Sequence, residues 1–186
     1  MSDMRTSLRC ACGSESGWLL VEVADGLPAA NCRACSGHLM ALDDYRRWHE
    51  RAGATDVADV ATIDLPPSDA TDNARHCPHC ARFMQRLRVG APVDFRIDRC
   101  SPCQQVWFDD GEWTALSQAG LAQRLLDVLS DGWQRQVRTD DVRERRQADL
   151  CERHGAERLH ELARMRDWLN AQPQREELLA LLRAGW

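Results

Sequence analysis

Two stretches of the chain alternate between apolar and polar residues with a period of two. The apolar positions of the longer stretch are Phe83, Leu87, Val89, Val93, Phe95 and Ile97, and Gly90-Ala91-Pro92 interrupts it. In the shorter stretch Leu19, Val21 and Val23 alternate before Asp25-Gly26, and a return segment leads to Cys32. Period-two alternation is typical of half-buried strands, and Gly- or Pro-containing breaks are typical of the turns between them. The pattern predicts two β-hairpins.

From Trp113 onward the apolar residues recur at helical spacing. The first stripe comprises Leu116, Leu121, Leu125, Val128, Leu129 and Trp133, and the second, thinner stripe comprises Leu150, Leu159, Leu162, Trp168 and Leu169. Thr139-Asp140-Asp141 is typical of a helix cap and predicts a second, highly charged helix reaching about Asn170. Pro173 and Gly185 bracket a last, leucine-rich helix. Three such helices are typical of a small bundle or a docking arm, and the interspersed charge also suits a coiled-coil dimer.

Cysteine pairs flank the longer hairpin. Cys77 and Cys80 precede it, Cys100 and Cys103 follow it, and each pair has the spacing C-x-x-C. Two thiolates spaced by two residues can hold one zinc ion from a single turn, and a second turn completes the tetrahedral shell. Because four thiolates leave no open position for water or substrate, the pattern predicts a structural site.

A helix is expected directly after the second pair. Trp107-Phe108 is followed by Asp109, and Glu112 three residues later completes a capping-box pattern. Cysteine turn, hairpin, cysteine turn and short helix together make a zinc ribbon. The motifs Cys77-Pro78-His79-Cys80 and Ile97-Asp98-Arg99-Cys100-Ser101-Pro102-Cys103 and the segment Trp107–Trp113 resemble the transcription-factor zinc-finger family of prokaryotic zinc ribbons, named for its likeness to the ribbon of the general factor TFIIB. Ala81-Arg82 and Gln104-Gln105 stand where that family has glycines. The resemblance implies fold and metal and says little about function.

Residues 1–52 are interpreted as a divergent first copy of the same unit. Its candidate ligands are Cys10, Cys12, Cys32 and Cys35. Cys12 and Cys32 are 20 positions apart, as are Cys80 and Cys100, which predicts a tandem repeat. A short helix is expected from Asp43-Asp44-Tyr45. Because the opening pair is C-x-C, His38 is an alternative ligand, and loss of the metal from this copy is a second alternative.

These patterns divide the chain into four parts. We expect the first zinc ribbon in residues 1–52, an acidic, proline-containing linker in 53–75, the second ribbon in 76–114 and a helical region in 115–186. The predicted fold class is therefore small metal-bound β, as tandem zinc ribbons with two structural zinc ions, plus an all-α C-terminal region. The linker carries five aspartates and has no arginine before its last residue, Arg75. It is interpreted as a tether, or alternatively as a mimic of nucleic acid that occupies a basic face of the same chain.

One face of the second hairpin is rich in arginine. Its members are Arg82, Arg86, Arg88 and Arg96, interrupted by Asp94 and Asp98. Guanidinium groups in such a row could bind phosphates of DNA or RNA. The alternative is a solvated strand face on which arginine and aspartate pair across the hairpin. Cys151 and His154, one turn apart in a predicted helix, are interpreted as ordinary helix residues.

Composition narrows the class of protein. The net charge of −5 argues against broad attraction to nucleic acid, and no run approaches the roughly 18 apolar residues that span a bilayer. Eight of nine cysteines come in close pairs without an export signal, which favours metal binding in a reducing, cytoplasmic compartment of a bacterium. No nucleophile motif or phosphate loop is found. We expect a non-enzymatic adaptor that binds a protein partner through its C-terminal helices, with nucleic-acid binding as the alternative and a homodimer as a further option.

Overall fold

The computed structural model describes residues 9–15, 17–52, 75–91 and 93–185. The predicted linker at 53–75 lies outside these residues except for Arg75. The strands are β1 (Trp18–Ala24), β2 (Leu27–Cys32), β3 (His38–Ala41), β4 (Gln85–Arg88), β5 (Arg96–Cys100) and β6 (Gln105–Phe108). The helices are α1 (Leu42–Ala52), α2 (Glu112–Gln118), the 3-10 turn η1 (Ala122–Arg124), α3 (Leu125–Val128), α4 (Asp131–His154), α5 (Ala156–Asn170) and α6 (Arg175–Ala184).

All six strands belong to one antiparallel sheet with the order β1-β2-β3-β6-β5-β4. Each half of the sheet contains one predicted hairpin followed by a third strand. The halves join where β3 pairs with β6, with Leu39 opposite Trp107. Leu39 follows Cys35 by four residues and Trp107 follows Cys103 by four. The two halves are therefore related by an approximate two-fold axis that passes between these two residues. The sequence patterns predicted the hairpins but not their union.

One face of the sheet carries the main hydrophobic core. Met40, Ile97 and Phe108 project from the strands into it and meet residues of α1, α2 and α3. Side-chain hydrogen bonds tie these helices across the two halves. The Tyr45 hydroxyl donates to the Ala122 carbonyl at 2.8 Å, and Trp113 Nε1 donates to the Val23 carbonyl at 2.9 Å. Helices from both halves thus cover the same face.

The opposite face carries a second cluster, which we call the cysteine layer. Its buried members are Cys10, Cys32, Leu39, Cys77, Met84, Cys100 and Trp107. Trp107 lies fully buried in this layer and meets Trp18 edge-to-face with ring centroids 6.1 Å apart. Its Nε1 donates to Asp109 Oδ1 at 2.9 Å. Cysteines of both halves therefore share one apolar layer.

The helical predictions need three corrections. The single helix expected from Leu116 to Trp133 is divided into α2, η1, α3 and the start of α4, although its leucines are buried as expected. The helix cap expected at Thr139 is wrong, because α4 begins at Asp131 and runs through that position to His154. The helix expected to continue to Asn170 is interrupted at Gly155, which has a φ of 84°.

Two smaller expectations also changed. Half of the capping box is present: Glu112 Oε2 accepts from the Asp109 backbone N–H at 2.7 Å, but the Asp109 carboxylate binds Trp107 and Arg75 instead of the helix N-terminus. Phe83 is exposed and stacks on His76, with ring centroids 4.2 Å apart, rather than facing the core.

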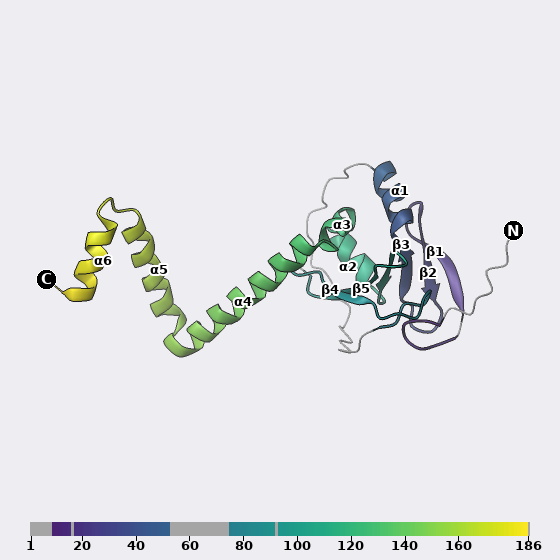
Figure 1. Ribbon diagram of the computed structural model, residues 1–186, viewed down its shortest axis with the longest axis horizontal. Helices are drawn as coiled ribbons and strands as arrows, with labels where there is room; N and C mark the ends of the chain where they lie inside the picture. Colours follow the sequence, from purple (N-terminus) through teal and green to yellow (C-terminus); the bar gives the residue numbers. More distant parts are fainter. Residues whose placement is uncertain (1–8, 16, 53–74, 92, 186) are drawn as a thin grey trace. The chain divides into compact units, whose positions relative to one another are not determined.

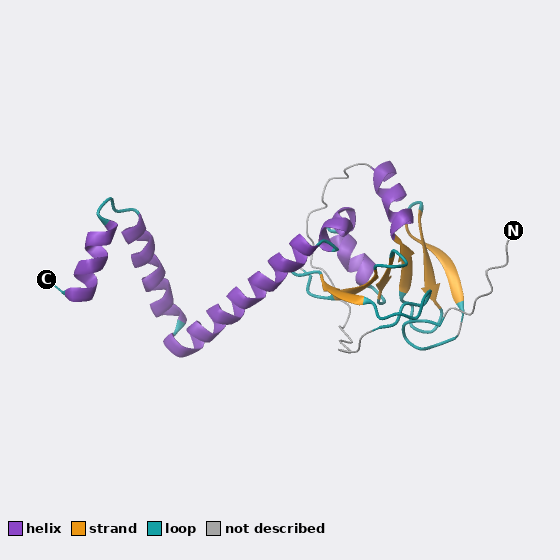
Figure 2. Ribbon diagram, in the orientation of Figure 1, coloured by secondary structure: helices purple, strands orange, loops and turns teal. Residues whose placement is uncertain are grey.

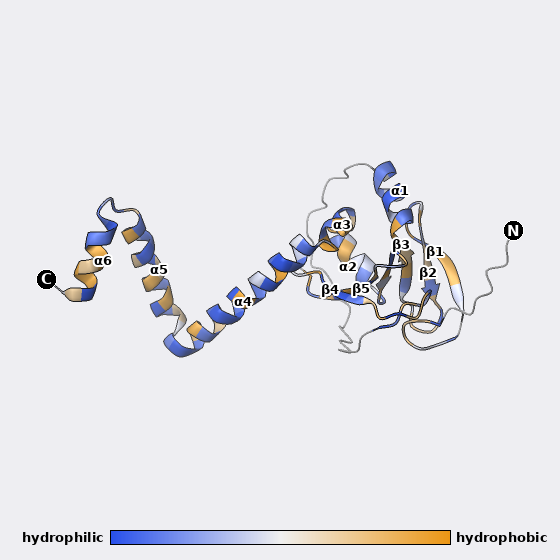
Figure 3. Ribbon diagram, in the orientation of Figure 1, coloured by the Kyte–Doolittle hydropathy of each residue, from blue (hydrophilic) through white to orange (hydrophobic). Residues whose placement is uncertain are grey.

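The chain forms two compact units, residues 1–137 and 138–186. The first contains the sheet, its covering helices and the first turns of α4, so the boundary expected at residue 114 lies within it. The second contains the rest of α4 with α5 and α6. Several of its large apolar side chains are exposed: Val142, Leu162, Met165, Trp168, Leu181 and Leu182. In Figure 3 hydrophobic and hydrophilic positions alternate along these helices.

The junction between the halves depends on a glycine. A Cβ atom on Gly37 would lie 2.2 Å from the Trp107 ring, which is buried and cannot move aside. We expect Gly37→Ala to lower the free energy of unfolding by about 3 kcal/mol, the upper range for overpacking a core. Chemical denaturation followed by circular dichroism measures this.

The matched control is Gly132→Ala in α4. A Cβ there meets nothing closer than Ser130 Oγ at 3.7 Å. Because alanine favours helix, this change leaves the stability unchanged or raises it by less than about 1 kcal/mol. Equal stability of Gly37→Ala and the wild type would contradict the proposed junction.

Candidate metal centres

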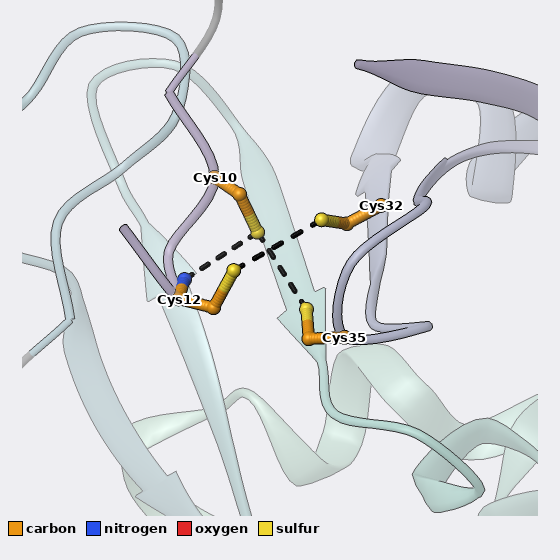
Figure 4. Close-up of side chains that lie close together, drawn as sticks. All are labelled: Cys10, Cys12, Cys32 and Cys35. Carbon is orange, nitrogen blue, oxygen red and sulfur yellow. Dashed lines mark hydrogen bonds between the residues drawn. The ribbon is translucent and has the colours of Figure 1, made fainter. Parts of the chain in front are cut away.

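The first group of cysteines lies beside the hairpin of β1 and β2. Cys10 and Cys12 come from the turn before β1, and Cys32 and Cys35 come from the end of β2 and the turn that follows (Figure 4). All four sulfur atoms lie within 4.8 Å of one another. Cys10 Sγ is 3.7 Å from Cys35 Sγ, and Cys12 Sγ is 4.0 Å from Cys32 Sγ. Four sulfurs bound to one tetrahedral zinc at about 2.3 Å are about 3.8 Å apart, so this spacing fits the ion.

The second group has the same construction. Cys77 and Cys80 precede β4, Cys100 ends β5, and Cys103 lies in the turn before β6. The four sulfurs again lie within 4.8 Å of one another, and Cys80 Sγ is 3.6 Å from Cys100 Sγ. In each group two cysteines are buried and the other two lie nearer the surface. Both groups thus have the donor set and the spacing of a closed four-sulfur site.

Backbone turns aim the sulfur atoms at one another. In two of the three C-x-x-C turns the backbone N–H of the residue after the last cysteine donates to the carbonyl of the first: Ser36 donates to Cys32 at 2.9 Å and Ala81 to Cys77 at 2.8 Å. In the third turn the Gln104 N–H donates instead to the Ser101 carbonyl at 3.4 Å. The C-x-C turn achieves the same closure one residue earlier, because the Gly13 N–H donates to the Cys10 carbonyl at 2.8 Å. The C-x-C spacing therefore still places the sulfur atoms of Cys10 and Cys12 in the first group.

The residue after each cysteine pair adopts a left-handed backbone conformation. These residues are Gly13 with φ 87°, Ser36 with φ 57°, Ala81 with φ 57° and Gln104 with φ 52°. Glycine adopts this conformation freely, whereas other residues do so at a cost. The missing glycines noted at Ala81 and Gln104 are thus sites of local backbone strain.

The surroundings of the clustered thiols raise the pKa values of some and lower those of others. Burial raises the pKa values of Cys35 and Cys77 to about 11. The pKa of Cys80 falls to about 7 because the Arg82 backbone N–H and neighbouring thiols donate to its sulfur. The pKa of Cys32 also falls to about 7, although burial alone would raise it, because backbone N–H groups and adjacent thiols stabilise its thiolate. A divalent cation among the sulfurs would favour ionisation of all four.

Two histidines lie close to the clusters, in different ways. His38, the alternative ligand, is not among the atoms gathered in the first group; its Nε2 lies 3.3 Å from Asn31 Nδ2, and burial lowers its pKa. His79 was not singled out by the sequence, but its Nδ1 lies 3.5 Å from Cys103 Sγ. The histidine at the third position of Cys77-Pro78-His79-Cys80 was the sequence signal for this contact.

A charged network borders the second group. Arg75 contacts Asp109 at 2.5 Å and Asp98 at 3.5 Å. Asp98 is almost completely buried, and burial raises its pKa to about 6. Burial likewise raises the pKa of Glu112 to about 8. Because Asp109 also binds the Trp107 indole, the network holds Trp107 in place within the cysteine layer.

The predicted arginine face is only partly assembled. Arg86 and Arg88 lie on β4 and Arg96 on β5, whereas Arg82 lies in the turn before these strands. Arg88 forms a bidentate ion pair with Asp94, with distances of 2.5 and 2.6 Å. Arg86 is opposite Asp98 in the sheet register. Aspartates therefore accompany two of the three strand arginines, but one of these aspartates, Asp98, is buried and so is not part of a solvated face.

The remaining sequence candidates show no site. Cys151 and His154 lie in α4, where Cys151 Sγ accepts from Gln147 Nε2 at 3.7 Å. Among the residues that the structure describes, only the two cysteine groups bring three or more potential ligand atoms together. None of the described helices is both long enough and apolar enough to cross a bilayer.

Comparisons with known proteins add no assignment. No protein-family model matches this sequence, and searches of curated proteins and of solved structures gave no match. The two cysteine groups and the sheet that carries them are therefore the basis for a functional conclusion.

The strained turns make a testable prediction. Replacing Ala81, which is exposed and has a φ of 57°, by glycine removes the strain but increases the freedom of the unfolded chain. We expect Ala81→Gly to raise the free energy of unfolding by about 0.5–1 kcal/mol. The control Ala81→Val, with a branched side chain at the same φ, lowers it. Thermal denaturation of both metal-loaded variants measures the effects, and a destabilised Ala81→Gly would refute the assigned strain.

Proposed function

We propose that the protein is a zinc-binding, non-catalytic adaptor with a regulatory role, in which two tandem zinc ribbons form the folded base and the C-terminal helices contact a protein partner. The observation that carries this proposal is the pair of four-cysteine groups with tetrahedral sulfur spacing. Thiolates are soft ligands, and four of them in a closed shell favour zinc over magnesium or calcium.

The metal is proposed to hold the fold rather than to react. Each half of the sheet contains fewer than about 50 residues, which is too few to bury a stable core without cross-links or metal. Four sulfur ligands would leave no coordination position for water or substrate. The cysteine layer gives the metal a structural task, because cysteines of both halves pack around Trp107. These features support a scaffold and give no support to catalysis at the metal.

Exposed apolar residues support the proposed protein contact. Trp168 and Leu162 on α5 are each 58% exposed, and Leu182 on α6 is 65% exposed. Apolar side chains gathered on one part of a surface often mark protein interfaces. We propose that both ribbons belong to the TFIIB-like family, because the second ribbon resembles it. This resemblance is the reason to propose a partner in the transcription machinery.

Nucleic-acid binding through Arg82, Arg86, Arg88 and Arg96 is the competing function. The bidentate pair of Arg88 with Asp94 disfavours it, because a phosphate would have to displace a carboxylate already in place. The proposal therefore favours a protein partner.

Metal analysis tests the first half of the proposal. Zinc content measured by elemental analysis is expected to be two ions per chain. The Cys77→Ser/Cys100→Ser variant retains one at most, and the control Cys151→Ser retains two. Strong chelation is expected to abolish the β-sheet signal in circular dichroism while helical signal persists, because structural zinc contributes roughly 10–16 kcal/mol in small domains. Fewer than two zinc ions in wild-type protein purified under reducing conditions would refute the assignment.

A variant of the second unit tests the adaptor role. Trp168→Glu/Leu182→Glu places charge on exposed positions without disturbing the sheet. We expect it to keep both zinc ions and to lose the protein that co-purifies with the wild type, as read by quantitative mass spectrometry. The control Arg86→Ala/Arg88→Ala keeps that protein. Binding of a mixed DNA duplex with a steep salt dependence, lost in the arginine variant, would instead support the nucleic-acid function.

A further inference from the structure

The six-stranded sheet has two edges, and they are treated differently. β1 forms one edge and β4 the other. An edge strand presents backbone N–H and C=O groups that can pair with another strand, so native proteins usually shield or interrupt it.

The β4 edge is shielded by a side chain. Gln134 of α4 accepts from the Arg88 backbone N–H at 3.1 Å and donates to the Arg88 carbonyl at 2.9 Å. These are the two hydrogen bonds that a neighbouring strand would make with the backbone of Arg88. The strand is also short, and it carries Arg86 and Arg88. No further strand can add to β4 without displacing Gln134.

The β1 edge has a different character. β1 is seven residues long, pairs with β2 alone among the described strands, and is largely hydrophobic in Figure 3. Its apolar side chains are exposed on both faces of the sheet: Leu20 is 82% exposed and Leu19 is 43% exposed. Glu22 is the single charged residue in the strand. Nothing on the strand resembles the arginines and glutamine that close β4.

The register shows which backbone groups of β1 face outward. Leu20 is opposite Ala30, and Glu22 is opposite Pro28, which has no N–H. The Arg33 N–H donates to the Gly17 carbonyl at 3.3 Å. Because hydrogen-bonded pairs alternate along an antiparallel ladder, Leu19 and Val21 exchange hydrogen bonds with β2. Because the direction alternates along a strand, the backbone N–H and C=O of Leu20 and Glu22 point away from β2.

We propose that the β1 edge is a homodimer surface, on which β1 pairs antiparallel with β1 of a second copy about a two-fold axis at Leu20. In this register Leu20 faces Leu20 of the second copy, and this pair exchanges two hydrogen bonds. Leu19 comes opposite Val21, and Glu22 comes opposite Trp18 rather than another Glu22. The pairing therefore brings no like charges together and covers the exposed leucines on both faces. The bulge between Glu22 and Ala24 limits the length of the pairing.

The second copy is preferred over a foreign strand because the edge is self-complementary. The same chain already uses this solution internally, where β3 and β6 pair across the approximate two-fold axis between Leu39 and Trp107. The dimer does not depend on the identity of the metal or on the C-terminal helices, so it goes beyond the function proposed above.

Sedimentation equilibrium of the full-length protein tests the proposal. The protein concentration is raised to about 1 mM, because a single strand pair is a small interface and the dimer is expected to be weak. Wild type is expected to approach twice its mass of 21.1 kDa. Leu20→Glu is expected to weaken the dimer at least about tenfold, since two carboxylates then meet at the axis. The control Leu182→Glu, exposed to a similar degree on α6, leaves the dimer unchanged.

A charge-swap experiment tests the register. Leu20→Glu and Leu20→Arg are each expected to be monomeric alone, and an equimolar mixture is expected to form a heterodimer, because opposite charges then face each other at the axis. The zinc content and circular dichroism of both variants should match the wild type, since Leu20 is exposed.

A monomeric wild type, a Leu20→Glu variant that dimerises as the wild type does, or a mixture that stays monomeric would each overturn the proposal. Loss of the dimer in Leu182→Glu but not in Leu20→Glu would assign self-association to the helices instead. If the β1 edge bound a strand of another protein instead, the wild type would be monomeric. Amide hydrogen exchange at Leu20 would then slow down only in the presence of that protein. None of these outcomes changes the zinc stoichiometry, so failure of this proposal is distinguishable from failure of the proposed function.

Discussion

The packing of Trp107 at the junction of β3 and β6 holds the first unit together. Its indole fills the space left by Gly37 of the other half, meets Trp18, and donates to Asp109. The same side chain lies in the cysteine layer together with cysteines of both four-sulfur groups. Each half alone would have a three-stranded sheet with little core. Joined at this position, the halves gain a continuous sheet, with helices on one face and cysteines on the other.

The local chemistry of the chain was readable because it depends on near neighbours. The spacing of Cys77, Cys80, Cys100 and Cys103 predicted a group that the structure brings within bonding distance of one ion, and period-two alternation located the hairpins. Even the C-x-C turn at Cys10 delivers its sulfurs, because Gly13 closes the turn one residue earlier. Turn geometry is set by a few consecutive residues, so sequence alone reaches it.

The parts that sequence missed depend on contacts between distant residues. Thr139 has the propensity of a cap, but α4 begins at Asp131, where Trp133 donates to the Val89 carbonyl at 2.9 Å and Gln134 bonds β4. The pairing of β3 with β6 involves only four residues from each strand. Neither strand has a pattern that identifies its partner. Tertiary hydrogen bonds determine where α4 begins, and the space beside Gly37 for the Trp107 ring determines how β3 pairs with β6. A pattern of apolar and polar residues along the chain contains neither contact.

The equal spacing of the two cysteine sets conceals a difference in how each half uses its residues. Leu20 pairs with Ala30 and Arg86 pairs with Asp98, and Ala30 and Asp98 each precede a cysteine by two positions. Leu20 and Arg86 therefore occupy equivalent places in the sheet, yet one follows Cys12 by eight residues and the other follows Cys80 by six. The connection from Arg86 to Asp98 in the second half is longer than that from Leu20 to Ala30 by the same two residues, so the total spacing between the cysteines is equal. An ungapped alignment of the two halves, anchored on the cysteines, would therefore misalign the whole first strand, whereas the register of the strand pairs places equivalent residues correctly.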